Sequence, residues 1–373
     1  MNGRISKVIK IGGFAHIRAV HIGGGSPVVI QTMWKDRLLF EELEEAAKRI
    51  EGLSRMGCGL LRFAVPDLAA AETLGRLAGM VSMPLTADIH FDYKIALRCM
   101  DFPIAKIRIN PGNIGGREKV RAVLEKASDK DLPIRIGINA GSLPNDLRRR
   151  VGEGMGRAEA LAAAAERELA VFDEFNFSNT LVSMKASGIA DTIRANRILA
   201  ERTSVPLHIG VTEAGPLIAG AARSGAALAM LLAEGIGDTL RVSLSDSMEN
   251  EVIAAREICG AAAEIAGLSG EAETAARLKR GGVKVISCPR CGRHSFDTHG
   301  FTMRWLKRFY AMDKNITVAI MGCVVNGPGE AEEADLGITG AGGKVLIFRN
   351  GKVMRTVDAV DAEEAFEEEL NKL

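Results

Sequence analysis

The sequence predicts a (β/α)8 barrel followed by a small α+β domain. Eight short runs of mostly apolar residues recur along the first part of the chain, and helix-forming, Ala-rich stretches separate them. Alternating strand and helix signals are typical of a parallel sheet, and eight such units are typical of a closed, TIM-like barrel. After about residue 268 the alternation stops, and turn-rich sequence with several cysteines follows. An open, doubly wound sheet is the alternative arrangement for the first part.

The expected barrel strands begin with apolar residues and end with polar or charged ones. The intervals between them are long enough for one helix and two loops, as a crossover between parallel strands requires. A β-rich segment, residues 8–22, precedes the first strand, and a turn at residues 23–25 follows that segment. The expected strands cover residues 28–33, 60–65, 85–90, 106–110, 134–139, 181–186, 207–212 and 239–244.

One amphipathic stretch follows each expected strand. In a barrel of this kind the carboxyl ends of all the strands meet at one mouth, where such folds carry their active sites. The expected helices cover residues 40–56, 67–80, 93–99, 117–127, 158–176, 189–201, 219–232 and 250–261.

The rest of the chain predicts a smaller domain of a different kind. Asn350-Gly351 is a strong hairpin signal between two apolar runs. We place the barrel domain at residues 1–265 and the second domain at residues 266–373, with 266–280 as a surface approach to it. The expected strands here are residues 284–287, 317–321, 344–348 and 352–356, and the expected helices are 301–312 and 363–373.

Composition narrows the class of protein. The 373 residues are 47% hydrophobic and carry a net charge of +1, which offers no electrostatic argument for binding nucleic acid or a membrane surface. No apolar run reaches the roughly 18–20 residues of a membrane span. Residues 1–7 are not followed by the apolar core of a secretion signal. We therefore expect a cytoplasmic protein that binds neither nucleic acid nor a membrane.

Three cysteines lie in turn-forming sequence of the second domain. Cys288 and Cys291 form a C-x-x-C pair, and Cys323 follows in a glycine-rich segment. Converging thiolates indicate a soft metal centre. A Cys3His zinc site is one interpretation, with His294 or His299 as the fourth ligand. A [4Fe-4S] cluster is another, and a redox-active or incidental C-x-x-C pair is a third. Cys58, Cys99 and Cys259 read as buried small apolar residues.

Cations gather at the expected strand ends of the barrel. Parallel barrel strands are normally almost wholly apolar, so four arginines on four strands are unusual. The guanidinium group matches phosphate oxygens in bidentate fashion, and these cations together predict a site for a small, multiply phosphorylated substrate. The candidates at the strand ends are Arg62, Asp88, His90, Arg108, Asn110, Arg135, Asn139, Lys185, His208, Thr212, Glu213, Arg241 and Ser243.

Three of these candidates have more than one interpretation. His90 and His208 suit either substrate binding or a purely structural role. Glu213 ends the seventh expected strand, where a carboxyl group can act as a proton donor or orient a neighbouring arginine.

Several long motifs resemble one enzyme family. They are residues 86–93 (TADIHFDY), 108–115 (RINPGNIG), 135–142 (RIGINAGS), 212–215 (TEAG) and 322–330 (GCVVNGPGE). Together they resemble 4-hydroxy-3-methylbut-2-enyl diphosphate synthase of the non-mevalonate isoprenoid pathway, in its bacterial two-domain form. That family opens the ring of 2-C-methyl-D-erythritol 2,4-cyclodiphosphate with two electrons and loss of water. The resemblance covers nearly the whole chain.

The resemblance implies a cofactor, partners and roles. Cys288, Cys291 and Cys323 would hold a [4Fe-4S] cluster, with Glu330 as a labile fourth ligand and Glu213 as the acid or base. Flavodoxin or ferredoxin would supply electrons, and the cluster domain of one subunit would cap the barrel of another in a homodimer. The implied substrate-binding residues are Arg62, His90, Arg108, Arg135, Asn139, Lys185, Arg241 and Ser243, to which we add His208. A zinc-stapled barrel that binds another sugar phosphate is the alternative function.

Two segments depart from the family pattern. After the first barrel strand the family usually has a Met-Thr-Asn-Thr-like run, whereas this chain has Met33-Trp34-Lys35-Asp36. After Ser243 the family often has an Asp-Pro pair, and the proline is absent from residues 245–248 here. A substrate-binding role of the first segment therefore does not carry over by resemblance.

Overall fold

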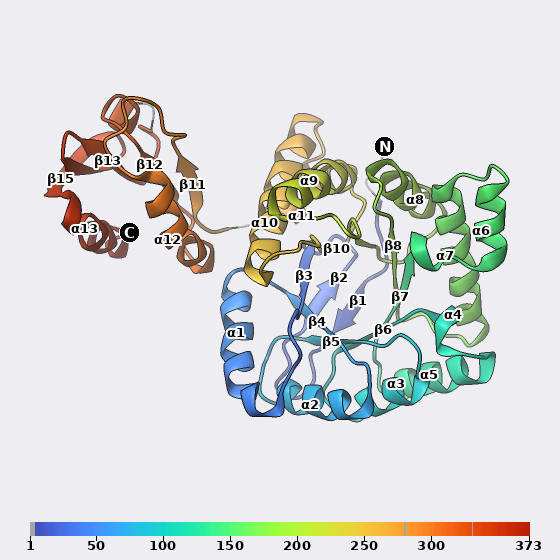
Figure 1. Cartoon of the computed structure of the whole chain (residues 1–373). Coiled ribbons are helices and arrows are strands. Elements are labelled where there is room, and N and C mark those ends of the chain that lie inside the picture. Colours follow the sequence, from blue (N-terminus) through green and yellow to red (C-terminus); the bar gives the residue numbers. More distant parts are fainter. Residues whose placement is uncertain (1–3, 280, 330) are drawn as a thin grey trace. The chain divides into compact units, whose positions relative to one another are not determined.

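The computed structural model describes residues 4–279, 281–329 and 331–373. The chain divides into two compact units, Met1–Arg280 and Gly281–Leu373, each of which is described by itself. The first unit is a parallel barrel and the second is a five-stranded sheet with helices (Figure 1). The predicted fold class, a (β/α)8 barrel followed by an α+β domain, is confirmed.

The barrel strands follow one another around the sheet in sequence order. Each strand is parallel to its neighbours, and the last strand, β10, lies between β3 and β9. A parallel bridge between Val182 and Leu207 links β8 to the start of β9 and so closes the ring. The strands are β3 (Val29–Met33), β4 (Leu60–Ala64), β5 (Leu85–Asp88), β6 (Lys106–Ile109), β7 (Ile134–Asn139), β8 (Thr180–Lys185), β9 (His208–Ile209) and β10 (Thr239–Leu240).

All eight expected barrel helices are present outside the strands (Figure 1). Two short helices after β6 and β7 were not expected, α4 (Pro111–Ile114) and α6 (Asn145–Gly152). Their sequences are rich in Gly, Asn and Arg, and lack an apolar helical period long enough to read. The expected helices are α1 (Leu43–Arg55), α2 (Leu68–Ala78), α3 (Tyr93–Cys99), α5 (Arg117–Asp129), α7 (Arg157–Glu174), α8 (Ile189–Arg202), α9 (Leu217–Ala233) and α10 (Met248–Leu268).

The amino-terminal end of the barrel is covered by a hairpin. Strands β1 (Ile9–Ile11) and β2 (Val20–Ile22) pair antiparallel. Their buried isoleucines form one apolar cluster with residues at or beside the starts of barrel strands, including Val29, Leu60 and Leu181. Burial of this apolar surface seals that end, so the carboxyl-terminal mouth is the end that remains for a site.

The described part of the expected approach, residues 266–279, belongs to the barrel unit. Helix α10 continues to Leu268, and α11 (Ala272–Leu278) contacts both α10 and α9. Leu278 is buried, and Arg277 forms an ion pair of 3.0 Å with Asp238. The stretch expected to approach the second domain is therefore packed on the barrel, because its apolar residues complete the α9–α10 surface.

The second unit has a mixed sheet. Its strand order is β11-β12-β13-β14-β15, with the first three parallel and the last two antiparallel. Stacked and edge-to-face rings of Phe301, Trp305, Phe309 and Phe366 join its two helices in one core. The elements are β11 (Lys284–Ser287), α12 (Thr298–Ala311), β12 (Thr317–Met321), β13 (Leu336–Ala341), β14 (Lys344–Arg349), β15 (Lys352–Asp358) and α13 (Ala362–Asn371).

The sequence did not predict β13, the central strand of this sheet. Its two glycines, Gly337 and Gly340, weaken the strand pattern. The structure explains why glycine occupies position 337: a Cβ atom there would lie 2.0 Å from Cζ of Phe348 on the neighbouring strand. The missing side chain makes room for that buried ring.

Gly337→Ala should therefore destabilise the second unit by about 1–3 kcal/mol, the usual cost of overpacking a core. One tryptophan lies in each unit, Trp34 and Trp305. In a Trp34→Phe background, urea unfolding followed by Trp305 fluorescence measures the change. Gly52→Ala, which adds a methyl group in open space on α1, is the control. An unchanged urea midpoint for Gly337→Ala would contradict the packing argument.

Candidate functional site

The barrel mouth holds a set of buried cations on neighbouring strands. The register of β5, β6 and β7 places Asp88 beside Arg108, and Arg108 beside Arg135. Asp88, Arg108 and Arg135 are 3%, 4% and 1% exposed. Strand pairing, and not a loop, thus fixes these three side chains relative to one another.

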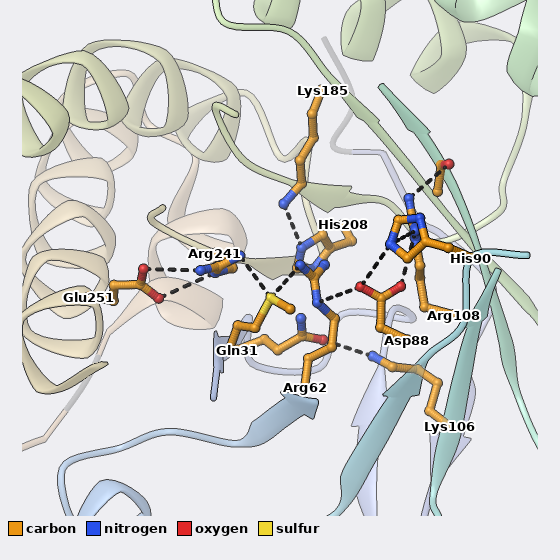
Figure 2. Close-up of polar contacts among 12 residues, drawn as sticks. Gln31, Arg62, Asp88, His90, Lys106, Arg108, Lys185, His208, Arg241 and Glu251 are labelled. Atoms are coloured by element: carbon orange, nitrogen blue, oxygen red, sulfur yellow. Dashed lines mark hydrogen bonds and ion pairs between the residues drawn. The ribbon is translucent and has the colours of Figure 1, made fainter. Parts of the chain in front are cut away.

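Asp88 is the carboxylate at the centre of this group (Figure 2). Its Oδ1 accepts a hydrogen bond of 3.0 Å from Nη1 of Arg108, and its Oδ2 lies 3.5 Å from Nε of Arg62. Nη1 of Arg108 also lies 3.1 Å from Nε2 of His90, and its Nη2 donates to the carbonyl of Gly137. Burial alone would raise the pKa of Asp88, but His90 and the nearby arginine charges outweigh it and lower that pKa. Asp88 is therefore an ionised counter-charge.

Arg135 is less well paired than Arg108. Its Nε and Nη1 atoms are buried and donate no hydrogen bond to any of the residues that the structure describes. Burial, followed by repulsion from Arg62 and Arg108, lowers its pKa well below the ordinary value. A buried charge without a partner is costly unless a ligand supplies one, so Arg135 indicates an anion at this position.

Lys106 is a further buried cation that the sequence did not single out. It lies at the start of β6, is 0% exposed, and donates a hydrogen bond of 3.1 Å to Oε1 of Gln31. Burial and then the charges of Arg135 and Arg62 lower its pKa well below the ordinary value. A lysine at the first position of an apolar strand reads as a solvated strand end; only barrel closure turns it inward.

His208 is placed beneath Lys185 and is fully buried. Its Nε2 lies 3.1 Å from Nζ of Lys185, and its Nδ1 lies 2.6 Å from Oγ1 of Thr239. Burial, then the charge of Lys185, lowers the pKa of His208 well below the ordinary value. The ring is therefore neutral, with Nε2 accepting from Lys185 and Nδ1 donating to Thr239. Both ring nitrogens are engaged, so this side chain orients Lys185.

Arg241 is held by a second buried carboxylate, Glu251 of α10. The guanidinium Nη2 and Nε lie 3.1 and 3.3 Å from the two carboxylate oxygens, a bidentate pair (Figure 2). Burial opposes ionisation of Glu251, but Arg241 and the hydroxyl of Thr32 lower its pKa on balance. The sequence did not reveal Glu251, because it reads as an ordinary charged residue in the first turn of a helix.

The remaining predicted residues lie around the mouth with more exposure. Glu213 is exposed and has a left-handed backbone, φ +52°. It lines a cavity of about 440 Å³ together with Asn139 and Thr212. The His90 side chain is 46% exposed, and Ser243 is partly buried.

Among the buried side chains that the structure describes at the mouth, positively charged groups outnumber negatively charged ones. Two buried carboxylates, Asp88 and Glu251, face six cations that are buried or nearly so. Burial lowers the pKa of Arg62 to about 10, against the attraction of Asp88. Such an arrangement favours a multiply charged anion. The six cations are Arg62, Lys106, Arg108, Arg135, Lys185 and Arg241.

In the second unit, two of the three cysteines of interest lie at one edge of the sheet. Cys288 directly follows β11, and its N–H donates to the carbonyl of Ile320 on the parallel neighbour β12. Cys323 lies two residues beyond the end of β12. Because carboxyl ends of parallel neighbours share an edge, the fold brings these segments together.

The loop of Cys291 reaches the same edge. The N–H of His294 donates to the carbonyl of Cys291, and the N–H of Ser295 donates to the carbonyl of Gly322. A Cβ on Gly322 would lie 3.2 Å from Cβ of His294, so the two loops pack closely. Cys288 is partly buried, Cys291 exposed and Cys323 buried.

The described side chains do not form a ready-made metal site. Across residues 4–279, 281–329 and 331–373, no three His, Cys, Asp or Glu side chains are grouped so that they could hold a metal ion. Glu330, the expected fourth ligand, lies outside the described residues. The donor chemistry still fits a soft metal centre, since three thiols come from adjoining loops at one sheet edge.

Comparison with known proteins decides the family. The model described as "GcpE TIM-barrel domain" matches residues 14–256, and the model described as "GcpE protein C-terminal domain" matches residues 284–372. The chain belongs to the GcpE family. The family resemblance read from the sequence motifs is thereby confirmed.

Full-length relatives agree with this assignment. A protein of Treponema pallidum (strain Nichols) is 49% identical over 99% of this chain and 92% of its own length. Relatives in Treponema denticola and Geobacter sulfurreducens are 46% and 41% identical over 99% and 95% of this chain, and over 99% and 95% of their own lengths. Each of the three is named 4-hydroxy-3-methylbut-2-en-1-yl diphosphate synthase (flavodoxin).

Within the part of the chain that the structure describes, no helix is long and apolar enough to cross a membrane.

Asp88→Asn should lower the free energy of unfolding at pH 7 by about 3–5 kcal/mol, because it leaves buried arginines without their counter-charge. Asp88 has a lowered pKa in the folded protein. Its stabilisation is therefore complete above the unfolded value near ~3.9 and is lost as the pH falls further.

Urea unfolding between pH 3 and pH 7 measures the difference between the two proteins, which should shrink below about pH 4. Asp92→Asn is the matched control: Asp92 caps α3, and asparagine caps a helix equally well. Equal effects of the two substitutions would contradict the role of Asp88.

Proposed function

We propose that this protein catalyses the reductive ring opening and dehydration of 2-C-methyl-D-erythritol 2,4-cyclodiphosphate to 4-hydroxy-3-methylbut-2-enyl diphosphate. Two electrons and two protons enter, and one water leaves. The names of the full-length relatives support this reaction. They do not favour the alternative, a zinc-stapled barrel for another sugar phosphate.

The buried cations at the barrel mouth are the observation that carries the proposal. Ring opening converts a cyclic diphosphate diester into a terminal diphosphate, which gains an ionisable oxygen. Arg135, whose buried Nε and Nη1 atoms have no acceptor among the described residues, suits an oxygen whose charge grows during the reaction. Arg108 and Lys185 are held by Asp88 and His208, so they need little reorganisation when substrate binds.

The residues that the sequence indicated then take these proposed roles. The diphosphate and its neighbouring oxygens are bound by Arg62, Arg108, Arg135, Lys185 and Arg241, with contributions from His90, Asn139 and Ser243. Glu213 protonates the departing hydroxyl, since it lines the mouth and is exposed. His208 acts through Lys185 and not by direct contact.

The second unit is proposed to carry the cofactor. Cys288, Cys291 and Cys323 would hold a [4Fe-4S] cluster, with Glu330 as a displaceable fourth ligand. When bound, the cluster would pass on the two electrons of the external donor and would supply a Lewis-acidic iron. The relatives' names include flavodoxin, which supports a flavodoxin electron donor, with ferredoxin as the second choice.

We also propose a homodimer in the cytoplasm. In this proposal the barrel unit binds the substrate, and the unit that begins at Gly281 binds the cluster.

Turnover tests the function. Protein reconstituted with iron and sulfide under exclusion of oxygen should convert the cyclodiphosphate with a chemical reductant. Cys323→Ser should lose most bound iron and all turnover, because an alcohol replaces thiolate poorly. Cys99→Ala, which keeps a small apolar residue at a buried site of the barrel, is the control. Equal iron loss in both variants would contradict the assignment of Cys323 as a cluster ligand.

The protein should take up protons when an anion binds at the barrel mouth. Burial lowers the pKa of Lys106, Lys185 and His208 in the free protein. A bound anion stabilises the protonated forms and raises these pKa values.

Sulfate is a suitable probe for this uptake, because it has no titratable proton near neutral pH. Calorimetric binding enthalpies at pH 7 in buffers of different ionisation enthalpy give the number of protons taken up. Lys185→Met should reduce that number. Net proton release by the wild-type protein would contradict the pKa directions.

A further inference from the structure

The loop after β3 is connected through Glu251 to Arg241, which follows the neighbouring strand β10. Nζ of Lys35 lies 2.9 Å from Oε1 of Glu251 and donates a hydrogen bond of 2.6 Å to the carbonyl of Leu244. This loop carries Trp34-Lys35-Asp36, the segment that departs from the family pattern. The contacts that Lys35 makes with Glu251 and Leu244 therefore follow from this chain's own sequence and not from the family pattern.

Glu251 is the acceptor that gathers these contacts. It is 1% exposed, and it accepts hydrogen bonds from Arg241, from the hydroxyl of Thr32 and from the N–H of Leu244. The same oxygen, Oε1, lies 3.1 Å from Nη2 of Arg241 and 2.9 Å from Nζ of Lys35. Two cations thus share one carboxylate oxygen.

The charge of this triad depends on Lys35. A bidentate Arg241–Glu251 pair alone has no net charge and little attraction for an anion. Lys35 adds a second cation, so the triad carries one net positive charge. Its side chain is 25% exposed, against 13% for Arg241. Arg241 directly follows β10, and Lys35 lies two residues beyond the end of β3.

Neighbouring contacts keep the loop in place. The ring of Trp34 stacks on that of Phe63 with 5.4 Å between centroids, and the guanidinium of Arg49 lies 5.3 Å from the Trp34 centroid. Arg49 also forms ion pairs with Asp36, at 3.1 Å, and with Glu249 of α10, at 3.4 Å. The position of Lys35 is thus determined by packing on both sides.

We propose that Lys35 is a positioning residue that sets the affinity of the barrel mouth for the diphosphate group by acting through Glu251 on Arg241. It offsets the charge of Glu251, so that Arg241 keeps its orientation from the carboxylate and its attraction for the substrate anion. The inference deepens the proposed function and rests on it for the identity of the substrate.

The test compares three variants with the wild-type protein. Inorganic pyrophosphate is the binding probe, measured by calorimetry at several salt concentrations, and the cyclodiphosphate is the turnover substrate. Lys35→Met removes the cation, Lys35→Arg retains it, and Lys48→Met removes an exposed lysine of α1 as the matched control. Lys35→Gln replaces Lys35→Met if the latter unfolds.

Lys35→Met should weaken pyrophosphate binding and raise KM about tenfold, the lower range for a hydrogen bond to a charged group, while kcat changes by less than about twofold. The salt dependence of binding should become shallower, because the site loses one net charge. Lys35→Arg and Lys48→Met should stay close to wild type.

A purely structural role of Lys35 predicts a different pattern. Pyrophosphate binding by Lys35→Met that matches wild type, or that weakens with an unchanged salt dependence, would overturn the proposal. If the wild-type protein binds pyrophosphate in a Lys35-dependent way but does not convert the cyclodiphosphate, the role of Lys35 stands and the proposed function fails. The two failures are therefore distinguishable.

Discussion

Excess positive charge inside the mouth of the barrel is the constraint on which the site depends. Like charges at short range repel strongly where water is excluded, and each buried cation also loses its hydration. The barrel tolerates them because strand pairing and closure hold the backbone rigidly, and because Asp88 and Glu251 each neutralise part of the charge. The positive charge that remains favours the binding of an anionic ligand.

The two carboxylates do different work. Asp88 ends a barrel strand and lies among Arg62, Arg108 and His90, so it orders the cations that line one side of the mouth. Glu251 comes from a helix outside the barrel and reaches back to Arg241. Through Lys35 it also connects the loop after the first strand. Each of the two carboxylates thus holds cationic side chains from separate strands in one preformed binding surface.

The second unit applies the same topological rule to a different chemistry. In the barrel the cations lie on parallel strands or directly after them, and in the second unit Cys288 and Cys323 follow the carboxyl ends of the parallel neighbours β11 and β12. Arginines and lysines suit phosphate, and thiols suit a soft metal. The fold positions the groups, and the residue types decide what they bind.

The sequence by itself determined the alternation of strands and helices, the cations at strand ends and the cysteine pattern, because each depends on local order along the chain. Hydrophobic period and turn residues act over a few positions, so they can be read directly. Tertiary structure alone decided which carboxylate serves Arg241 and Lys35, that Lys106 is buried, and that His208 supports Lys185. Glu251 meets Thr32 across 219 positions of sequence, and Lys106 meets Gln31 across 75. Contacts at such separations arise only when the barrel closes, and no local pattern encodes them.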